Sequence, residues 1–448
     1  MNKRVIIMGA GGRDFHNFNR CFRDNEAYRV IGFTAAQIPG LEGKVYPPEL
    51  AGRLYPDGIP IYPENAISDL VKSHQVDLVV FAYSDVSHLT VGHKMSLVLA
   101  AGADFIILGP DKTMIPSRLP VLSICATRTG CGKSELTRKF CRLLITYGVR
   151  AIVIRHPMAY GDLARQAVQR FETREDLDRH HCTIEEREEY EPLISQNTIV
   201  YAGVDYAAIL AAVEQENPDM IIWDGGNNDF PFYKSDLEVV VVDPLRLGTE
   251  VSYHPGETNL RRAQVVVINK VDSAAAPDLE QLKQVISETN PTAVVVMAAS
   301  PYQVPRQDLI RGKKVLVIED GPTLTHGGMA YGVGVIAAKS LGAAELVDPR
   351  AYAVGSMAEV FRAYPQMGHL LPAMGYSQTM IAEMEATIAA VEADVVLSAT
   401  PIDLTELMTI NKPVARLTYE IADLGTPGFK DILEMFFAQT GIKTTSPS

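Results

Sequence analysis

The sequence has few cysteines for its length, and no two of them form a metal-binding or redox motif. Five are scattered along 448 residues, with no Cys-x-x-Cys pair among them. A disulfide framework needs an even set of cysteines in a short secreted chain, and a structural zinc site needs paired ligands. The sequence therefore predicts reduced thiols and excludes a zinc site built on cysteine.

Long apolar runs and an excess of positive charge are also lacking. No run of about 18 uncharged apolar residues is present, so no membrane span is predicted. The first residues, MNKRVIIMGAGG, enter a strand and a glycine turn at once, which leaves no room for a signal peptide. The net charge of −13 disfavours nucleic acid and anionic membranes as partners. We expect a cytoplasmic protein in which local cations hold any anionic substrate.

Short strands rich in Val, Ile and Leu recur along the whole chain and are separated by stretches typical of helices. Such continuous apolar strands indicate parallel sheets that are covered on both faces. The predicted fold class is α/β: a Rossmann-like parallel-sheet domain over 1–118, a doubly wound P-loop NTPase domain over 119–312, and an α/β segment over 313–448. Ligands of doubly wound sheets bind outside the carboxyl ends of the strands, so we expect the chemistry there.

The stretch TRTGCGKS, residues 127–134, has the ending of a phosphate-binding loop but carries Thr127 where the motif has its first glycine. The apolar strand VLSICA precedes it and an amphipathic helix follows, which is the context that this motif requires. A side chain at Thr127 is compatible with the loop if the tight turn falls on Gly130 and Gly132. We expect the nucleotide to contact Thr129, Gly130, Cys131, Gly132, Lys133 and Ser134.

Two later strand ends support this prediction. Asp224 ends the strand MIIWD, where P-loop enzymes carry the carboxylate that organises Mg²⁺, and the Ser134 hydroxyl would be the second protein ligand of that ion. Asn269, Lys270 and Asp272 match the NKxD pattern that reads guanine in GTP-binding proteins. We therefore expect Mg²⁺ as cofactor and ATP or GTP as co-substrate.

The first turn, GAGGRDFHNFN, does not fit a dinucleotide site. Asp14 stands where the third glycine of G-x-G-x-x-G belongs, and the second strand ends without the acidic residue that binds a ribose hydroxyl. Arg13, His16, Asn17 and Asn19 crowd the turn with donors instead. These residues either suit an anion or form an ordinary polar surface.

A dense charge run, FETREDLDRHHCTIEEREEYE, lies between the second and third strands of the P-loop region. Blocks of charge are usually exposed to solvent, so the run predicts a solvated helical face or a mobile insertion. A lid or switch segment is the alternative.

Seven motifs together resemble the cyclic 2,3-diphosphoglycerate synthetases and related predicted GTPases. They are GAGGRDFHNFN, TRTGCGKS, WDGGNND, HPGE, NKVD, EDGPTLTHGGMAYG and INKPVARLTYE, and they span essentially the whole chain. The resemblance implies a ligase that depends on ATP and Mg²⁺ and closes a phosphoanhydride between the two phosphates of 2,3-diphosphoglycerate.

Such a reaction brings anions together and therefore needs cations, of which arginine binds phosphate in a bidentate manner. We expect Lys133, Asp224, Arg155 and His156 to act in catalysis. The candidates for binding a small phosphorylated acid are Arg13, His16, Arg246, His254, Arg261, Arg262, His326 and Lys412. A homodimer is expected, because apolar stretches such as MAYGVGVIAAKSLGA could form a contact between subunits as easily as a core.

Three other functions fit parts of the pattern. NKVD also suits a regulatory GTPase related to metallocentre-assembly proteins, although no histidine-rich or cysteine-based metal motif accompanies it. A small-molecule kinase would phosphorylate the acid without closing a ring. A dehydrogenase is disfavoured because the first turn lacks the glycine and the acid that it needs.

Overall fold

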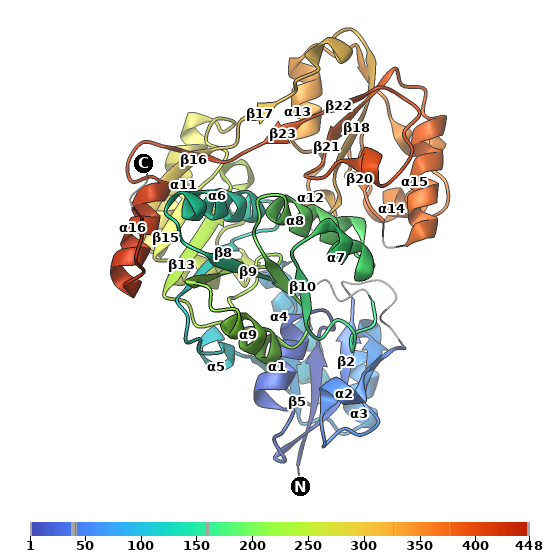
Figure 1. Ribbon diagram of the computed structural model, residues 1–448. Helices are drawn as coiled ribbons and strands as arrows, with labels where there is room; N and C mark the ends of the chain where they lie inside the picture. Colours follow the sequence, from blue (N-terminus) through green and yellow to red (C-terminus); the bar gives the residue numbers. More distant parts are fainter. Residues whose placement is uncertain are drawn as a thin grey trace.

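The computed structural model describes residues 2–36, 41, 43–156, 161–325, 327–375 and 377–445. Three main sheets follow one another along the chain (Figure 1), each built largely of parallel strands. The predicted α/β class, with a Rossmann-like domain, a P-loop domain and a further α/β segment, is confirmed. In the described residues, no helix combines the length and the apolar character that crossing a membrane requires.

The N-terminal sheet has the strand order β3-β4-β2-β1-β5-β7, and only β3 runs antiparallel to its neighbour. Its strands are β1 (Lys3–Met8), β2 (Tyr28–Ala35), β3 (Val45–Tyr46), β4 (Ile59–Pro63), β5 (Leu78–Phe81) and β7 (Asp104–Ile107). Its helices are α1 (Arg13–Cys21), α2 (Pro48–Ala51), α3 (Ile67–Ser73), α4 (His88–Ala101) and α5 (Pro110–Thr113). Two separate cores cover its two faces, as expected for a doubly covered sheet.

The central sheet has the order β10-β11-β9-β12-β8-β13-β15-β16-β24. Its strands are β8 (Val121–Ala126), β9 (Ala151–Arg155), β10 (Gln169–Phe171), β11 (Val200–Ala202), β12 (Met220–Asp224), β13 (Leu237–Val242), β15 (Val265–Ile268), β16 (Val294–Ala299) and β24 (Ala422–Leu424). Its helices are α6 (Lys133–Thr146), α7 (Arg174–Arg179), α8 (Ile184–Ile194), α9 (Tyr206–Gln215), α10 (Gly256–Arg262) and α11 (Ala276–Thr289). The P-loop strand β8 lies between β12 and β13, so the ends of all three strands meet at one place.

The third sheet has the order β19-β18-β21-β22, with β20 paired to β18. Its strands are β18 (Lys314–Asp320), β19 (Glu345–Leu346), β20 (Leu371–Ala373), β21 (Val395–Ala399) and β22 (Val414–Arg416). Its helices are α12 (Gly321–Leu324), α13 (Val333–Ser340), α14 (Ser356–Ala363) and α15 (Gln378–Ala390). The strand β18 ends at Asp320, which faces the central domain and lines a pocket there.

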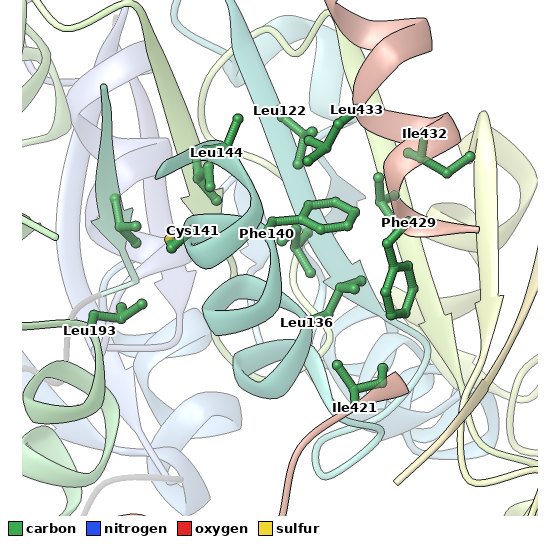
Figure 2. Close-up of a cluster of buried hydrophobic side chains, with 14 of the residues drawn as sticks. Leu122, Leu136, Phe140, Cys141, Leu144, Leu193, Ile421, Phe429, Ile432 and Leu433 are labelled. Carbon is green, nitrogen blue, oxygen red and sulfur yellow. The ribbon is translucent and has the colours of Figure 1, made fainter. Parts of the chain in front are cut away.

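The last part of the chain returns to the central sheet. The strand β24 pairs antiparallel with β16, and α16 (Phe429–Thr440) lies beside α6. Figure 2 shows Phe429, Ile432 and Leu433 of α16 packed toward Phe140 and Leu136 of α6. Burying side chains of this size stabilises the fold by about 1.5–3 kcal/mol each. The C-terminal helix therefore belongs to the core that supports the P-loop helix.

Two short ladders connect the domains. The strand β6 (Val86–Ser87) of the N-terminal region pairs with β14 (Tyr253–His254) of the central region. The strand β17 (Tyr302–Gln303) pairs with β23 (Thr418–Tyr419). These ladders bring loops from all three domains toward the carboxyl ends of the central strands.

The charge run between β9 and β11 forms α7 and α8, and the expectation of a solvated face is correct for α7 and wrong for α8. The charged side chains of α7 other than Asp176 are exposed, whereas in α8 Glu185, Glu186, Glu188 and Glu191 are all buried. The helix begins with a capping box in which Thr183 and Glu186 satisfy each other's backbone amides. The charges are buried because α8 packs between α6 and the third domain, where Ile184 joins the third domain's core.

Candidate active site

One pocket collects residues from all three domains at the carboxyl ends of the central strands. The N-terminal domain contributes the turn Ala10–Asp14, the central domain contributes residues 129–130 and 132–135, and the third domain contributes Asp320 and Thr323. The helix α8 contributes three glutamates to the same wall. Ligand sites of doubly wound sheets are expected at this edge.

The phosphate-binding loop turns at Gly130 and Gly132, whose φ angles of 81° and 112° are in the left-handed region. Thr127 directly follows β8, and its amide still donates to the carbonyl of Val241 in β13 at 3.1 Å. It is not among the residues with positive φ. The structure thus confirms that the loop does not need a glycine at position 127, because the tight turn is made by Gly130 and Gly132.

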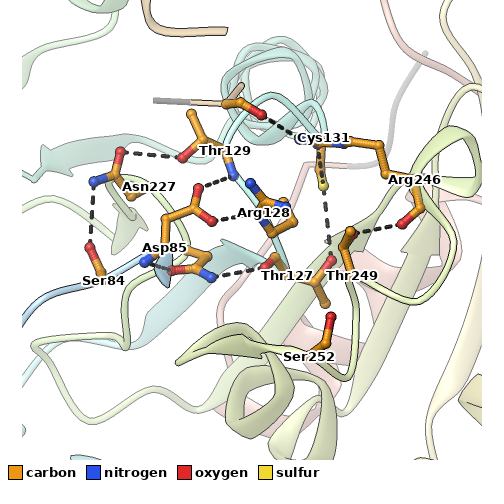
Figure 3. A network of polar contacts seen from close by, with 12 residues as sticks. Ser84, Asp85, Thr127, Arg128, Thr129, Cys131, Asn227, Arg246, Thr249 and Ser252 are labelled. Carbon is orange, nitrogen blue, oxygen red and sulfur yellow. Dashed lines mark hydrogen bonds and ion pairs between the residues drawn. The ribbon is translucent and has the colours of Figure 1, made fainter. Parts of the chain in front are cut away.

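A carboxylate of the N-terminal domain braces this loop. Asp85 accepts hydrogen bonds from the Thr129 amide at 2.8 Å and from Arg128 Nε at 2.5 Å. The Arg128 guanidinium also lies 3.5 Å from the centre of the Tyr253 ring. Figure 3 shows Asp85 beside Arg128 and Thr129, with Asn227 on the far side of Thr129. Arg128, a cation in the loop, is therefore engaged by Asp85 and held away from phosphate.

Lys133 begins α6 and is 7% exposed, with its ammonium group donating to the carbonyl of Asn227. Burial lowers the pKa of Lys133, because the charged form loses its hydration. A buried ammonium group is stabilised when it binds an anion. The bond to one carbonyl leaves two donors of the ammonium group for phosphate oxygens.

Arg155 at the end of β9 links the groups beside Lys133. It forms ion pairs with Asp224 and, at 2.5 Å, with Glu189 of α8, and the Ser134 hydroxyl donates to Glu189 at 2.8 Å. Burial alone would lower the pKa of Arg155, but the two carboxylates raise it above its ordinary value. Asp224 is 1% exposed, and burial raises its pKa in spite of Arg155.

Asp224 and Ser134 are suited to a magnesium ion. One oxygen of the buried Asp224 carboxylate, Oδ2, pairs with Arg155, and the other, Oδ1, accepts no hydrogen bond from the described residues. Such a carboxylate has free lone pairs, and hard oxygen ligands are what Mg²⁺ requires. In the described part of the chain, no group of three or more acidic, histidine or cysteine side chains could hold a metal on its own. Nucleotide phosphates would therefore have to complete the shell.

Two of the NKxD residues, Asn269 and Lys270, hold the phosphate-binding loop through hydrogen bonds to its carbonyls. Asn269 donates to the carbonyl of Cys131 at 2.9 Å, and Lys270 donates to the carbonyl of Gly130 at 2.8 Å and to Asp243 at 2.8 Å. A Cβ on Gly132 would lie 2.2 Å from the Asn269 amide nitrogen, so glycine is required there. Asp272 is exposed and lies outside the pocket lining, next to the Ser300 amide.

In the first glycine turn, the carboxylate of Asp14 binds the backbone amides that an external anion would otherwise use. Asp14 accepts hydrogen bonds from the amides of Gly11, Gly12 and Phe15 at 2.8, 3.1 and 2.7 Å. Arg13 pairs with Asp229 at 2.8 Å, and His16 stacks on Phe232 with a ring-centre distance of 4.2 Å. Both side chains are buried. The donors expected to receive an external anion are thus satisfied within the protein.

His156 lies where the first turn and the loop after Asp224 approach each other. A Cβ on Gly12 would lie 2.4 Å from the imidazole Cε1, and one on Gly226 would lie 2.6 Å from its Cγ. The ring is 3.4 Å from Asp229, which also pairs with Arg13. Two glycines therefore make room for this imidazole at the pocket wall.

The remaining predicted cations are not gathered at the pocket. Arg246 lies behind the loop, paired with Asp243 and 3.2 Å from the Cys131 sulfur. Arg261 pairs with Glu257 on the surface, and Arg262 pairs with Glu238 and Asp111. His254 packs against Phe81 and Phe230, and burial lowers its pKa to about 4.

Lys412 also has a structural role, because it donates to the carbonyls of Ile388 and Ala389 near the end of α15. His326 lies outside the described residues. The expected ring of basic loops around an anion is thus not formed by Arg261, Arg262, His254 or Lys412, since each is engaged elsewhere.

The sequence reasoning missed the acidic wall of the pocket. Glu185, Glu188 and Glu189 of α8 line it together with Asp320 of β18. Spacings of three and four residues put side chains on one helical face, which was the available signal. The signal was overlooked because the surrounding run of charges resembled a solvent-facing helix.

Comparison with known proteins gives one strong likeness. The chain is 57% identical over 432 residues to the arginine synthetase ArcE of Thermococcus kodakarensis, and the match covers 96% of each chain. The chain belongs to the ArcE arginine synthetase family. A search against protein-family models found no match.

Two solved structures show weaker likenesses. LpxK from Aquifex aeolicus, determined in complex with ATP, is 14% identical with a TM-score of 0.43, and the match covers 73% of this chain and 90% of that one. The hydrogenase maturation factor HypB from Archaeoglobus fulgidus is 16% identical with a TM-score of 0.28, and the match covers 40% and 81%. Likenesses of this strength carry no functional argument.

Membership of the ArcE family confirms the prediction of an enzyme of the ligase type with a P-loop. The named activity of the relative differs from the synthesis of cyclic 2,3-diphosphoglycerate that the motifs suggested.

Proposed function

We propose that this protein is an ATP-dependent ligase that forms arginine. The observation that carries the proposal is the 57% identity, over 96% of both chains, with a protein named arginine synthetase. The P-loop supports it, since a synthetase couples bond formation to nucleotide cleavage and this loop type holds nucleotide phosphates.

In this proposal the nucleotide phosphates bind the amides of the P-loop turn, residues 130–134, while the Thr129 amide stays with Asp85. Lys133 leaves the Asn227 carbonyl and binds the β- and γ-phosphates. Mg²⁺, held by Ser134 and Asp224, would neutralise phosphate charge. Asn269 and Lys270 keep the loop in shape, as their bonds to Cys131 and Gly130 suggest, and Asp272 would contact the base.

Arginine has one nitrogen more than the corresponding ureido amino acid, citrulline, which has an oxygen at that position. The γ-phosphoryl group would pass to the ureido oxygen and ADP would leave. Ammonia would then attack the ureido carbon, and the carbon–oxygen bond would break with release of phosphate. The sum is ATP, citrulline and ammonia to arginine, ADP and phosphate. Arg155 and Lys133 lie where they can stabilise the transferring charge.

His156 would be a proton carrier at this site. Its ring lines the pocket and lies 3.4 Å from the Asp229 carboxylate, which positions the imidazole. A proton must leave the attacking nitrogen as the guanidinium forms, and an imidazole near the pocket wall can accept it.

The resemblance to the cyclic 2,3-diphosphoglycerate synthetases suggests a different acceptor with two phosphates. The carboxyls of Glu188 and Asp320 in the pocket lining argue against such a polyanion, because like charges in a low-dielectric pocket repel strongly. Of the cations expected to bind it, Arg261, Arg262 and Lys412 are engaged elsewhere.

The test is a reaction of the purified protein with Mg²⁺, ATP, citrulline and ammonium. Amino-acid analysis measures arginine, and phosphorus NMR measures ADP and phosphate. We expect all three products in equal amounts. A parallel reaction replaces citrulline and ammonium with 2,3-diphosphoglycerate. Absence of arginine together with a cyclic phosphoanhydride signal would contradict the proposal, and GTP hydrolysis that neither acceptor stimulates would favour a regulatory GTPase.

A further inference from the structure

The acidic wall contains two carboxyls that the mechanism above does not use. Glu188 of α8 and Asp320 at the end of β18 both line the pocket, and Asp320 is the charged group with the strongest influence on Glu188. They come from different domains and meet where the third domain packs on α8. This contact buries Glu188 and leaves Asp320 partly exposed.

Glu188 lacks a partner that could offset its charge. It is 2% exposed, and its hydrogen-bonding neighbour is the carboxyl of Asp320, while no N–H group among the described residues donates to it. A buried carboxylate left in this state costs several kcal/mol. Burial and the neighbouring Asp320 together raise the pKa of Glu188 well above its ordinary value.

Other carboxylates of the pocket are already engaged. Asp14 has three backbone amides, Asp229 has Arg13, and Glu189 has Arg155 and Ser134. Asp320 accepts a hydrogen bond from Thr323 at 2.6 Å and is also hydrogen-bonded to the carboxyl of Glu188. The unfilled acceptor capacity of this wall is therefore concentrated at Glu188 and Asp320.

These carboxyls lie close to the phosphate-binding loop. Thr323, which donates to Asp320, approaches the loop so closely that a Cβ on Gly130 would lie 3.4 Å from its methyl carbon. Glu188 is adjacent in sequence to Glu189, which contacts Ser134 of the loop. A group bound between Glu188 and Asp320 would thus be next to the transferring phosphoryl group.

We propose that Glu188 and Asp320 form the subsite that binds the guanidinium group of arginine. This inference rests on the proposed function. A guanidinium is planar and offers several donors in a fixed fork, which matches two carboxylates. The pair also favours the reaction, because the neutral ureido group gains a positive charge as it becomes a guanidinium. Carboxylates aimed at that developing charge stabilise it.

The experiment compares Glu188→Gln and Asp320→Asn with the wild-type protein. Binding of L-arginine and of L-citrulline is measured by calorimetry in the presence of Mg²⁺ and ADP, and KM values are measured for ATP and for citrulline. We expect the Kd for arginine to rise about tenfold or more in each variant, because a charge-assisted hydrogen bond is lost. The Kd for neutral citrulline and the KM for ATP should change by less than about threefold.

Glu191→Gln is the matched control. Glu191 is on the same helix and is also buried, but it pairs with Arg174 and lies outside the pocket lining. This variant should bind arginine like the wild type. A loss of arginine binding in all three variants would indicate damage to α8 and would overturn the assignment.

Two other results would overturn the inference while leaving the proposed function intact. Wild-type turnover to arginine with unchanged arginine affinity in Glu188→Gln and Asp320→Asn would exclude the subsite. If a higher Mg²⁺ concentration restored arginine binding and turnover in both variants, the two carboxyls would be assigned to a metal ion instead. By contrast, a wild-type protein that neither binds nor forms arginine would remove the proposed function itself.

Discussion

Two glycine-rich turns border the pocket, and they differ in what their backbone amides contact. In the turn after β1, the carboxylate of Asp14 takes the amides of Gly11, Gly12 and Phe15. In the turn after β8, no carboxylate of the described residues takes the amides of Gly130 or Gly132, and Lys133 stands beside them. A glycine turn before a helix binds phosphate only while its amides are available.

The first turn has become structural as a consequence. Its arginine and histidine pack against Phe230 and Phe232 and hold the N-terminal domain on the central one. In the second turn Asp85 takes only the Thr129 amide, so Lys133 and the amides of Gly130 and Gly132 remain for a ligand. The same strand–turn–helix unit thus has a structural role after β1 and a ligand-binding role after β8. The difference arises from the carboxylate of Asp14, which occupies the amides of the first turn.

The largest effect is expected from Lys133→Ala. Removing the ammonium group should lower turnover of nucleotide a hundredfold or more, since it stabilises the charge on the transferred phosphoryl group. Steady-state kinetics measure the loss, and circular dichroism checks the fold. Lys139→Ala, on the same helix but paired with Glu420 and outside the pocket, should behave like the wild type. A folded Lys133→Ala protein with normal turnover would show that the second turn, like the first, does not bind the nucleotide phosphates.

Asp14→Ala should act on stability instead. Three backbone amides lose their acceptor, and buried N–H groups without an acceptor destabilise the folded state. The free energy of unfolding should therefore fall by about 2–4 kcal/mol. Urea unfolding measures this change, and Asp14→Asn, which keeps one acceptor oxygen, should lose less. The KM for nucleotide should stay within about twofold of the wild type. A large rise in that KM would mean that the first turn binds nucleotide.

Gly12→Ala tests whether the two turns are coupled through His156. The φ of Gly12, 169°, is an extended conformation that alanine can adopt, so only the 2.4 Å contact with His156 is disturbed. We expect turnover to fall about tenfold, because a displaced catalytic group is costly. Gly109→Ala, which would contact nothing within 4 Å, is the control. Equal activity of the two variants would show that His156 has no catalytic part.

The smallest effect is expected from Asp272→Asn. Asp272 is exposed and does not support the loop, unlike Asn269 and Lys270. Its loss should raise the KM of the preferred nucleotide by about tenfold or less, through one hydrogen bond to the base, without changing kcat. Kinetics with ATP and GTP measure both values. Identical KM values in variant and wild type would show that the NKxD match serves only to hold the P-loop.

The strands and the P-loop could be predicted because their signals are local. A run such as VLSICA followed by Gly, Lys and Ser specifies a buried strand and a turn without reference to the rest of the chain. The altered first position was also predictable, since Thr127 needs no special backbone conformation.

The substrate side of the pocket could not be predicted, because its charges depend on partners distant in sequence. Arg262 is neutralised by Glu238 and Asp111, and Arg13 is buried by Asp229. In the same way, Glu188 becomes a pocket residue only because the third domain covers α8 and brings Asp320 to it. The sequence shows the charges but not which of them cancel.

The most direct measurement is a crystal structure of the protein with Mg²⁺ and ADP. The account predicts phosphate oxygens on the amides of residues 130–134, with Lys133 moved from the Asn227 carbonyl to the β-phosphate and Asp14 still bound to Gly11 and Gly12. Phosphates on the turn after β1, with Asp14 displaced and Lys133 still on Asn227, would contradict it.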